Sequence, residues 1–157
     1  MTKVSPQEML KRATELQDKM KEAKSKTVAV GILADQATTK VYETGANVLE
    51  VGTWHEFGRG NNPKRSFLRN TFDTQRKLIK QKNFETFEKV LNSDQTVNNG
   101  LGIMGAFYTN LVKDAFTNNG YGTWKPIEPE TIDAKGSSRV LFDTGTLRRS
   151  ISWDIRG

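Results

Sequence analysis

The residues of this sequence that could do chemistry are a single histidine, His55, and the carboxylate beside it, Glu56. A histidine–glutamate pair occurs in helical zinc hydrolase sites, but such a site needs a second histidine four residues later, and Arg59 stands there. A serine nucleophile would depend on His55 as its base, and no Gly-x-Ser-x-Gly turn is present. We therefore interpret His55 as a hydrogen-bonded structural residue and predict no catalytic residue, metal site or cofactor. A hydrolase built on His55 is the alternative that replacement by glutamine would test.

Three further carboxylates cluster near a proline turn, at Glu128, Glu130 and Asp133. Glu130 and Asp133 would share one face of a helix. Acid–base catalysis needs carboxyl groups held in a concave pocket, which no pattern here indicates. We interpret them as charges at the N-terminus of a short helix that starts near Pro129 and ends at Gly136.

Length and composition limit the classes of protein that the chain can belong to. Its 157 residues fit one domain, and its apolar content of 35% is low, so we expect part of the chain to bury apolar surface only against neighbouring subunits. Cysteine is absent, which excludes disulfides and thiolate metal sites. No segment has the apolar length of a signal peptide core or a membrane span. The expectation is a soluble protein made in a cytosol, without an export signal or a membrane partner.

The net charge of +6 is concentrated in one segment. Its basic residues are Arg59, Lys64, Arg65, Arg69, Arg76, Lys77, Lys80, Lys82 and Lys89. Such a stripe can bind phosphate backbones, or it can be a solvated face or a surface for acidic proteins. A solvated face or a surface for acidic proteins is favoured over phosphate binding, because no nucleic-acid module is present and aromatic residues are not interleaved with the basic ones. A basic nucleic-acid-binding accessory protein stays open as the alternative function.

The elements that must position these residues begin with a capped helix. Ser5, Pro6 and Glu8 form a capping box with proline at the first helical position. An apolar stripe then repeats at helical spacing, and it could pack on the domain or on a neighbouring subunit. We divide the chain into this amphipathic helix, residues 1–26, and one domain, residues 27–157.

The domain is predicted to be α+β, with a small, mainly antiparallel sheet packed against two or three helices. We expect a buried strand at 28–33, an exposed loop at 34–47, a long helix at 66–91 and a second at 97–117, while the pattern at 48–57 fits either a strand or a short helix. The buried face of the helix at 66–91 is predicted to hold Phe67, Leu68, Phe72, Ile79, Phe84, Phe87 and Leu91. The helix at 97–117 is predicted to be the spine of the core, and its Gly102 and Gly105 to let another backbone approach.

The last third of the chain contains rigid turns and apolar anchors. Trp124 and Pro126 mark an ordered loop. Asp143 or Thr144 can cap free backbone N–H groups, and Gly145 supplies the backbone freedom of a tight turn. From Leu147 onward apolar and polar residues alternate as far as Ile155, which predicts a strand with one buried face.

Two of these segments resemble a known family. The His55-Glu56-Phe57-Gly58 block with the later Pro63-to-Arg69 run, and the Trp124-to-Ile151 run, are similar in order and spacing to blocks of phage virion-morphogenesis proteins, which form necks or complete tails. The resemblance spans roughly residues 27–156. It favours a helix at 48–57, because the residues before the His-Glu-Phe-Gly block tend to be helical in that family. Ser66 stands where many relatives have a second proline, so the turn after Arg65 is expected to be less rigid.

The resemblance implies a structural virion protein at the head–tail junction, assembled in the host cytoplasm as a neck or tail-completion ring subunit. Its implied partners are copies of itself, in a ring of six or twelve, and connector, tail-terminator, sheath or tube proteins. DNA passing through the lumen would make non-specific contact. The expected interface surfaces are the 34–47 loop and the first helix. The 55–69 segment is either a turn tied to the core or a contact between subunits, and Arg59, Lys64, Arg65 and Arg69 are the candidate interface or lumen residues.

Overall fold

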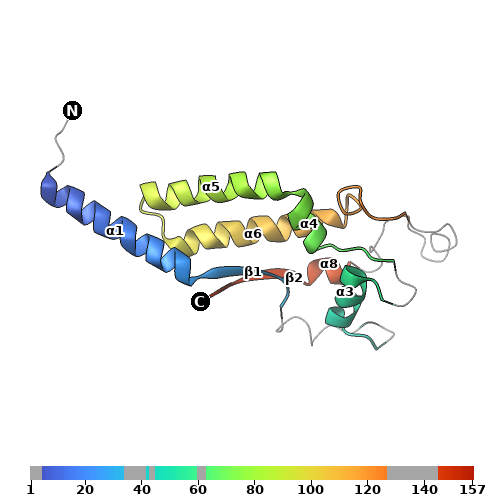
Figure 1. Ribbon diagram of the computed structural model, residues 1–157. Helices are drawn as coiled ribbons and strands as arrows, with labels where there is room; N and C mark the ends of the chain where they lie inside the picture. The colour runs from blue at the N-terminus through green and yellow to red at the C-terminus, as the bar shows by residue number, and fades with distance from the viewer. Residues whose placement is uncertain (1–4, 34–41, 43–44, 60–62, 127–144) are drawn as a thin grey trace.

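The computed structural model describes residues 5–33, 42, 45–59, 63–126 and 145–157, and every structural statement below refers to these ranges. The elements are α1 (Pro6–Ser25), β1 (Thr27–Ile32), α3 (Val48–Phe57), α4 (Arg69–Thr74), α5 (Arg76–Asn92), α6 (Val97–Ala115), α8 (Thr146–Arg149) and β2 (Ile151–Arg156). Figure 1 shows α5 lying on α6 and α6 lying on the two strands, with α3 and α8 beyond one end of the strands. The prediction of an α+β fold with a small antiparallel sheet is confirmed.

The sheet consists of β1 and β2 paired antiparallel over their whole length, from Thr27 opposite Arg156 to Ile32 opposite Ile151. Side chains alternate between the two faces of a strand, so one face carries only apolar residues. Those residues are Val28, Val30, Ile32, Ile151, Trp153 and Ile155. This face packs on α6, where an added Cβ on Gly105 would lie 2.5 Å from the Trp153 ring. Gly102 and Gly105 thus admit the side chain of Trp153, rather than a backbone.

Helix α6 is the spine of the core, as predicted. It carries nine of the buried residues, among them Leu101, Met104 and Val112. One apolar cluster gathers Phe67, Phe116 and Trp124 around its C-terminal end, and a second gathers Val90 and other residues around its N-terminal end. None of the described helices combines the length and the hydropathy that a membrane crossing requires.

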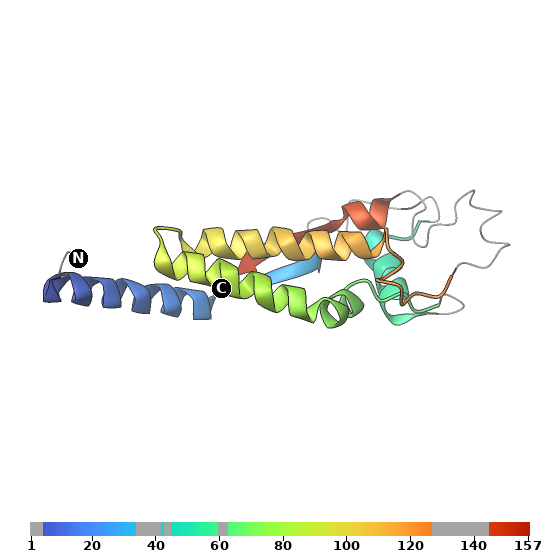
Figure 2. The same cartoon turned by 90° about the horizontal axis from the view of Figure 1, so that it is seen from above.

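Helix α1 begins as the sequence predicts. The Ser5 side chain accepts a hydrogen bond from Glu8 N, and the Glu8 carboxylate accepts one from Ser5 N. The helix is 20 residues long and has no buried residue. Figure 2 shows why, since only its C-terminal end lies beside α5 and α6 while the rest extends away from them.

Three predictions about the elements are wrong. The helix expected at 66–91 is divided at Gln75 into α4 and α5, because the Thr71 and Thr74 hydroxyls donate to the carbonyls four residues earlier and weaken the continuous ladder. Phe84 is 71% exposed instead of buried, because α5 turns its buried side chains, Thr86 and Val90, away from it. Leu147 belongs to α8, so β2 starts only at Ile151.

Other predictions are confirmed or lie outside the described residues. The strand expected at 28–33 and the helices expected at 48–57 and 97–117 correspond to β1, α3 and α6. From the 34–47 loop only Tyr42 and 45–47 are described, and Tyr42 N donates to Ala46 O across a tight turn. Asp143, Thr144 and the helix expected between Pro129 and Gly136 lie outside the described residues.

Candidate interaction surfaces around α3 and α1

The 55–69 segment is tied to the core through the carboxylate of Glu56. This side chain is only 6% exposed, near the C-terminal end of α3. It accepts hydrogen bonds from the Ser66 hydroxyl at 2.5 Å, from Leu68 N at 2.9 Å and from Arg69 N at 3.0 Å. The two N–H groups open α4, whose N-terminus has no side-chain cap of its own, so Glu56 takes the place of a cap.

A backbone bond extends this connection, because Arg65 N donates to the carbonyl of His55 at 2.8 Å. Gly58, with φ of 74°, ends α3, and a Cβ there would meet the Lys64 backbone at 3.2 Å. The chain that leaves α3 at Gly58 therefore returns to it at Lys64. These contacts show that the 55–69 segment is a turn tied to the core.

The four candidate cations lie around the end of α3. Arg59 and Lys64 are exposed, and the Arg69 guanidinium lies 5.6 Å from the centre of the Phe57 ring, which is itself 59% exposed. Arg65 is half-buried, its Nε has no hydrogen-bond partner among the described residues, and burial lowers the pKa of its guanidinium. Positive charge at a helix C-terminus is electrostatically favourable. These residues thus form a cationic rim beside an exposed aromatic ring.

The Trp124 block meets the 55–69 segment at Ser66. The Trp124 indole nitrogen donates to Ser66 O at 3.3 Å, and its ring packs edge-on against Phe116 at 5.9 Å between centroids. Ser66 therefore donates to Glu56 through its hydroxyl and accepts from Trp124 through its carbonyl. A proline at this position could accept the second bond but could not donate the first. The turn was expected to be less rigid because it lacks this proline, but the Ser66 hydroxyl attaches it to Glu56 instead.

The C-terminal part of the second block completes the same cluster. Leu147 is 4% exposed and packs with Phe67, and Gly145 adopts φ of 68° where the chain enters α8. Pro126 is exposed at the end of a described range. The two sequence blocks thus converge on one apolar cluster at the C-terminal end of α6.

A groove of about 480 Å³ runs beside β1. It is lined by five consecutive residues, Ala29 to Leu33, and by Leu49, Thr53 and Phe57 of α3, whereas β2 contributes only Arg156. Phe67, Leu68 and Arg69 also line it, so the groove is bounded by β1, α3 and the start of α4.

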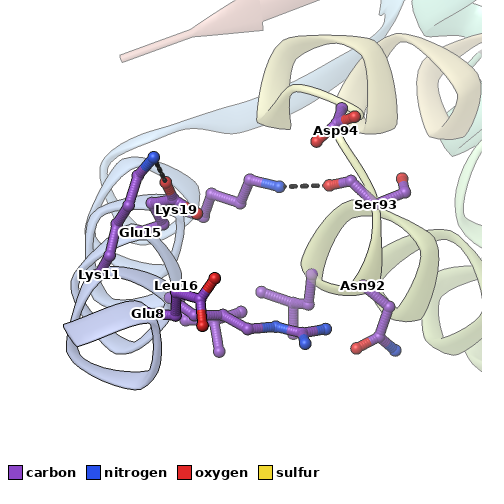
Figure 3. Close-up of a pocket in the computed structure, with 10 residues that line it drawn as sticks. Glu8, Lys11, Glu15, Leu16, Lys19, Asn92, Ser93 and Asp94 are labelled. Atoms are coloured by element: carbon purple, nitrogen blue, oxygen red, sulfur yellow. Dashed lines mark hydrogen bonds and ion pairs between the residues drawn. The ribbon is translucent and has the colours of Figure 1, made fainter. Parts of the chain in front are cut away.

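Two further grooves of about 300 Å³ each lie where α1 meets the end of α5. One is apolar and is lined by Met20 and Ala23 of α1 and by Phe87 and Leu91 of α5. Figure 3 shows the other, with Lys19 reaching from α1 toward the end of α5. Lys19 Nζ donates to Val90 O at 2.7 Å and to Ser93 O at 2.6 Å. These bonds attach α1 to carbonyls at the C-terminal end of α5.

Within the described ranges, no group of three histidine, cysteine or carboxylate side chains is placed to hold a metal ion. Compared with protein-family models, with curated proteins and with solved structures, the chain has no match in any of the three.

Sequence reasoning missed the buried polar residues that join the elements. Glu56 and Ser66 were recognised only as members of motif blocks, and nothing in their types or spacing indicates that they bond to each other. Tyr121 donates to Leu111 O at 2.7 Å, and burial, with a smaller contribution from Asp114, raises the pKa of its phenol to about 12. The signal that could have found it is Asn118-Asn119-Gly120, a helix-terminating turn that returns the chain toward α6.

Proposed function

We propose that this chain is a non-enzymatic structural protein of a tailed-phage virion, a neck or tail-completion ring subunit at the head–tail junction. The proposal combines the resemblance of the two sequence blocks with the geometry of a protein that must bind neighbours. Its partners are further copies of the chain and the connector or tail proteins next to the ring.

The observation that carries the binding role is α1. An amphipathic helix of 20 residues without a buried residue has its apolar stripe largely uncovered, with Met9 59% and Met20 50% exposed. Most of the stability of a helix in a protein comes from packing its apolar face rather than from intrinsic propensity. The stripe therefore needs a partner outside the chain.

The convergence of the two blocks supports the resemblance itself. Family motifs that are far apart in the sequence are expected to meet when they form one structural unit. Here Ser66 of the first block contacts Trp124 of the second, and Phe67 shares a cluster with Leu147. Both blocks carry apolar anchors and turns, which is the chemistry of a scaffold.

The experiment is the native mass of the purified protein, alone and after mixing with particle components, followed by electron imaging. We expect a closed ring of identical subunits or incorporation at the neck of a tailed particle. Met9→Glu places a charge in the apolar stripe and should reduce incorporation at least tenfold. Thr14→Glu, on the other face of α1, is the matched control and should incorporate normally.

The contrary result is a stable monomer that ignores particles and shifts a DNA fragment with steep salt dependence. That result would favour the basic nucleic-acid-binding alternative, for which the basic residues of the 59–89 segment would be the contacts. Charge reversal at Lys64, Arg65 and Arg69 should then abolish DNA binding without unfolding the protein.

A further inference from the structure

We propose that the cationic rim at the end of α3, together with the exposed Leu49 and Phe57 side chains of that helix, docks an acidic surface of a different protein. The docked surface would carry apolar side chains among its carboxylates. The inference deepens the proposed function, and it rests on that function only for the identity of the partner as a connector or tail protein. It concerns a different part of the molecule from the stripe on α1.

The first step is the charge of the rim, whose members are Arg59, Lys64, Arg65 and Arg69. In the part of the chain that the structure describes, the ion pairs join other residues, and none of these four cations takes part in one. The adjacent carboxylate, Glu56, is buried and already accepts three hydrogen bonds. A carboxylate from outside the chain would supply the acceptor that Arg65 Nε lacks among the described residues.

The second step is the apolar surface beside the rim. Leu49 is 48% and Phe57 59% exposed, and both line the groove of about 480 Å³ that is bounded by β1, α3 and the start of α4. Arg69 lines the same groove, and its guanidinium lies 5.6 Å from the centre of the Phe57 ring. Arg156 also lines the groove, but Asp154 lies 3.9 Å from it and offsets its charge. The groove therefore combines apolar surface with cations of the rim.

This combination favours a protein partner over a nucleic acid. Arginine and aromatic residues are enriched at protein interfaces, and the arginine fork pairs bidentately with carboxylates. A phosphate backbone would use the charges of the rim but would leave Leu49 and Phe57 uncovered. Base stacking would compete with the Arg69 guanidinium for the Phe57 ring. Carboxylates beside apolar side chains complement both parts of the surface.

Charge also identifies the partner as a different protein rather than a second copy. The chain has a net charge of +6, so two copies repel each other. Most of its described carboxylates already hold helix caps, side chains or backbone N–H groups of the same chain. The described carboxylates without such a bond belong to α5, to the loop after it and to α6, and they are Glu88, Asp94 and Asp114. The described surface of a second copy thus offers separate charges on three elements.

The first test uses two labelled peptides, one built from repeated Leu-Glu-Glu units and one with lysine in place of glutamate. Fluorescence anisotropy should show the unchanged protein binding the glutamate peptide at least tenfold more tightly. Lys64→Glu combined with Arg69→Glu should weaken that binding at least tenfold. Lys77→Glu combined with Lys80→Glu changes the net charge equally on α5 and should bind as the unchanged protein does. Equal binding by the two variants would overturn the inference.

The second test separates the apolar contact from the charge. Phe57→Ala should weaken binding of the Leu-Glu-Glu peptide severalfold but leave binding of polyglutamate unchanged, because polyglutamate has no apolar side chain to place against α3. Phe84→Ala, at a side chain that is 71% exposed on α5, is the matched control. Equal effects of the two substitutions would overturn the inference. So would a duplex DNA fragment that binds more tightly than the glutamate peptide and is released by the Lys64→Glu, Arg69→Glu change.

The third test compares self-association with docking. Native mass spectrometry of the Lys64→Glu, Arg69→Glu variant should show the same assembly of identical subunits as the unchanged protein, and thermal unfolding checks that the variant folds. Its incorporation at the neck of a tailed particle should fall at least tenfold. Loss of self-association would mean that the rim joins identical copies, and it would overturn the inference.

The outcomes separate this inference from the proposed function. Rim-dependent binding of the glutamate peptide by a protein that never joins a phage particle would keep the inference and remove the proposed function. Normal incorporation of the Lys64→Glu, Arg69→Glu variant would keep the function and remove the inference.

Discussion

The indole nitrogen of Trp124 donates a hydrogen bond to the carbonyl of Ser66, 3.3 Å away, across 58 positions of sequence. The hydroxyl of the same serine donates to the carboxylate of Glu56. One residue in a turn thus attaches the loop after α6 to the C-terminal end of α3. Since Trp124 and Ser66 are both buried, neither bond competes with solvent.

Replacing Glu56 by glutamine should destabilise the fold. The glutamine amide keeps one acceptor oxygen, but its NH₂ group replaces the other oxygen. At least one of the three donors, which are the Ser66 hydroxyl and the N–H groups of Leu68 and Arg69, then loses its acceptor. Leaving a buried donor unsatisfied costs about 1–3 kcal/mol, so we expect Glu56→Gln to lower the free energy of unfolding by about 2 kcal/mol in urea titrations.

The matched control for that variant is Glu88→Gln, which makes the same chemical change at an exposed position of α5. Surface changes of this kind are usually within about 0.5 kcal/mol. Equal urea midpoints for the two variants would show that the carboxylate of Glu56 does not anchor the turn.

Replacing Gly105 by alanine should distort the contact between α6 and β2. Alanine has a higher helix propensity by about 1 kcal/mol, but its Cβ would lie 2.5 Å from the Trp153 ring. We expect the overlap to outweigh the propensity and to lower stability by about 1–3 kcal/mol. At Gly102 the nearest Trp153 atom lies 3.3 Å from the added Cβ, so Gly102→Ala should be neutral or stabilising.

Thermal unfolding measures both glycine variants. Combining Gly105→Ala with Trp153→Leu should recover part of the loss, because the smaller side chain leaves room for the methyl group. Additive losses in the double variant would mean that the two residues do not interact.

Local patterns were sufficient to predict most of the elements. The capping box at Ser5, the apolar run of β1 and the periodicity of α6 are all signals within one segment, and all three were correct. The short α8 was missed because it depends on a distant contact, since Leu147 packs in a cluster with Phe67. The break at Gln75 was missed because residue type does not show that the Thr71 and Thr74 hydroxyls bond to carbonyls of their own helix. Apolar type alone could not show that Phe84 is exposed.

The candidate surfaces were predicted less completely than the elements. Charge and motif identified Arg65 and Arg69, but the groove beside β1 depends on which distant segments pack next to the strand. That information is tertiary, because β1 pairs with a strand from the other end of the chain. The first helix was correctly marked as amphipathic, and the structure adds that only its C-terminal part lies beside α5 and α6.

Replacing Lys19 by methionine should loosen α1 from the domain. The variant keeps the apolar stem but removes the ammonium that binds Val90 O and Ser93 O. We expect faster amide hydrogen exchange in the last turns of α5 and in α1, with a loss of about 1 kcal/mol in stability. Lys21→Met, an exposed control on the same helix, should exchange as the unchanged protein does. Identical exchange in both variants would contradict the attachment.

Tyr121 should make stability fall at high pH. Burial first, and the charge of Asp114 second, raise the pKa of its phenol to about 12, whereas an unfolded tyrosine ionises near about 10. Between these values the unfolded chain has lost the proton that the folded chain still holds, so the free energy of unfolding decreases as pH rises. Below about pH 10 both states are protonated, and this contribution is fully present.

Urea titrations from pH 9 to 12 should show a smaller decline in the free energy of unfolding for Tyr121→Phe. In a spectrophotometric titration of this variant, the tyrosinate absorbance that develops at the highest pH should be missing. A decline of the same slope in the variant would show that the hydroxyl held by Leu111 O is not the group responsible.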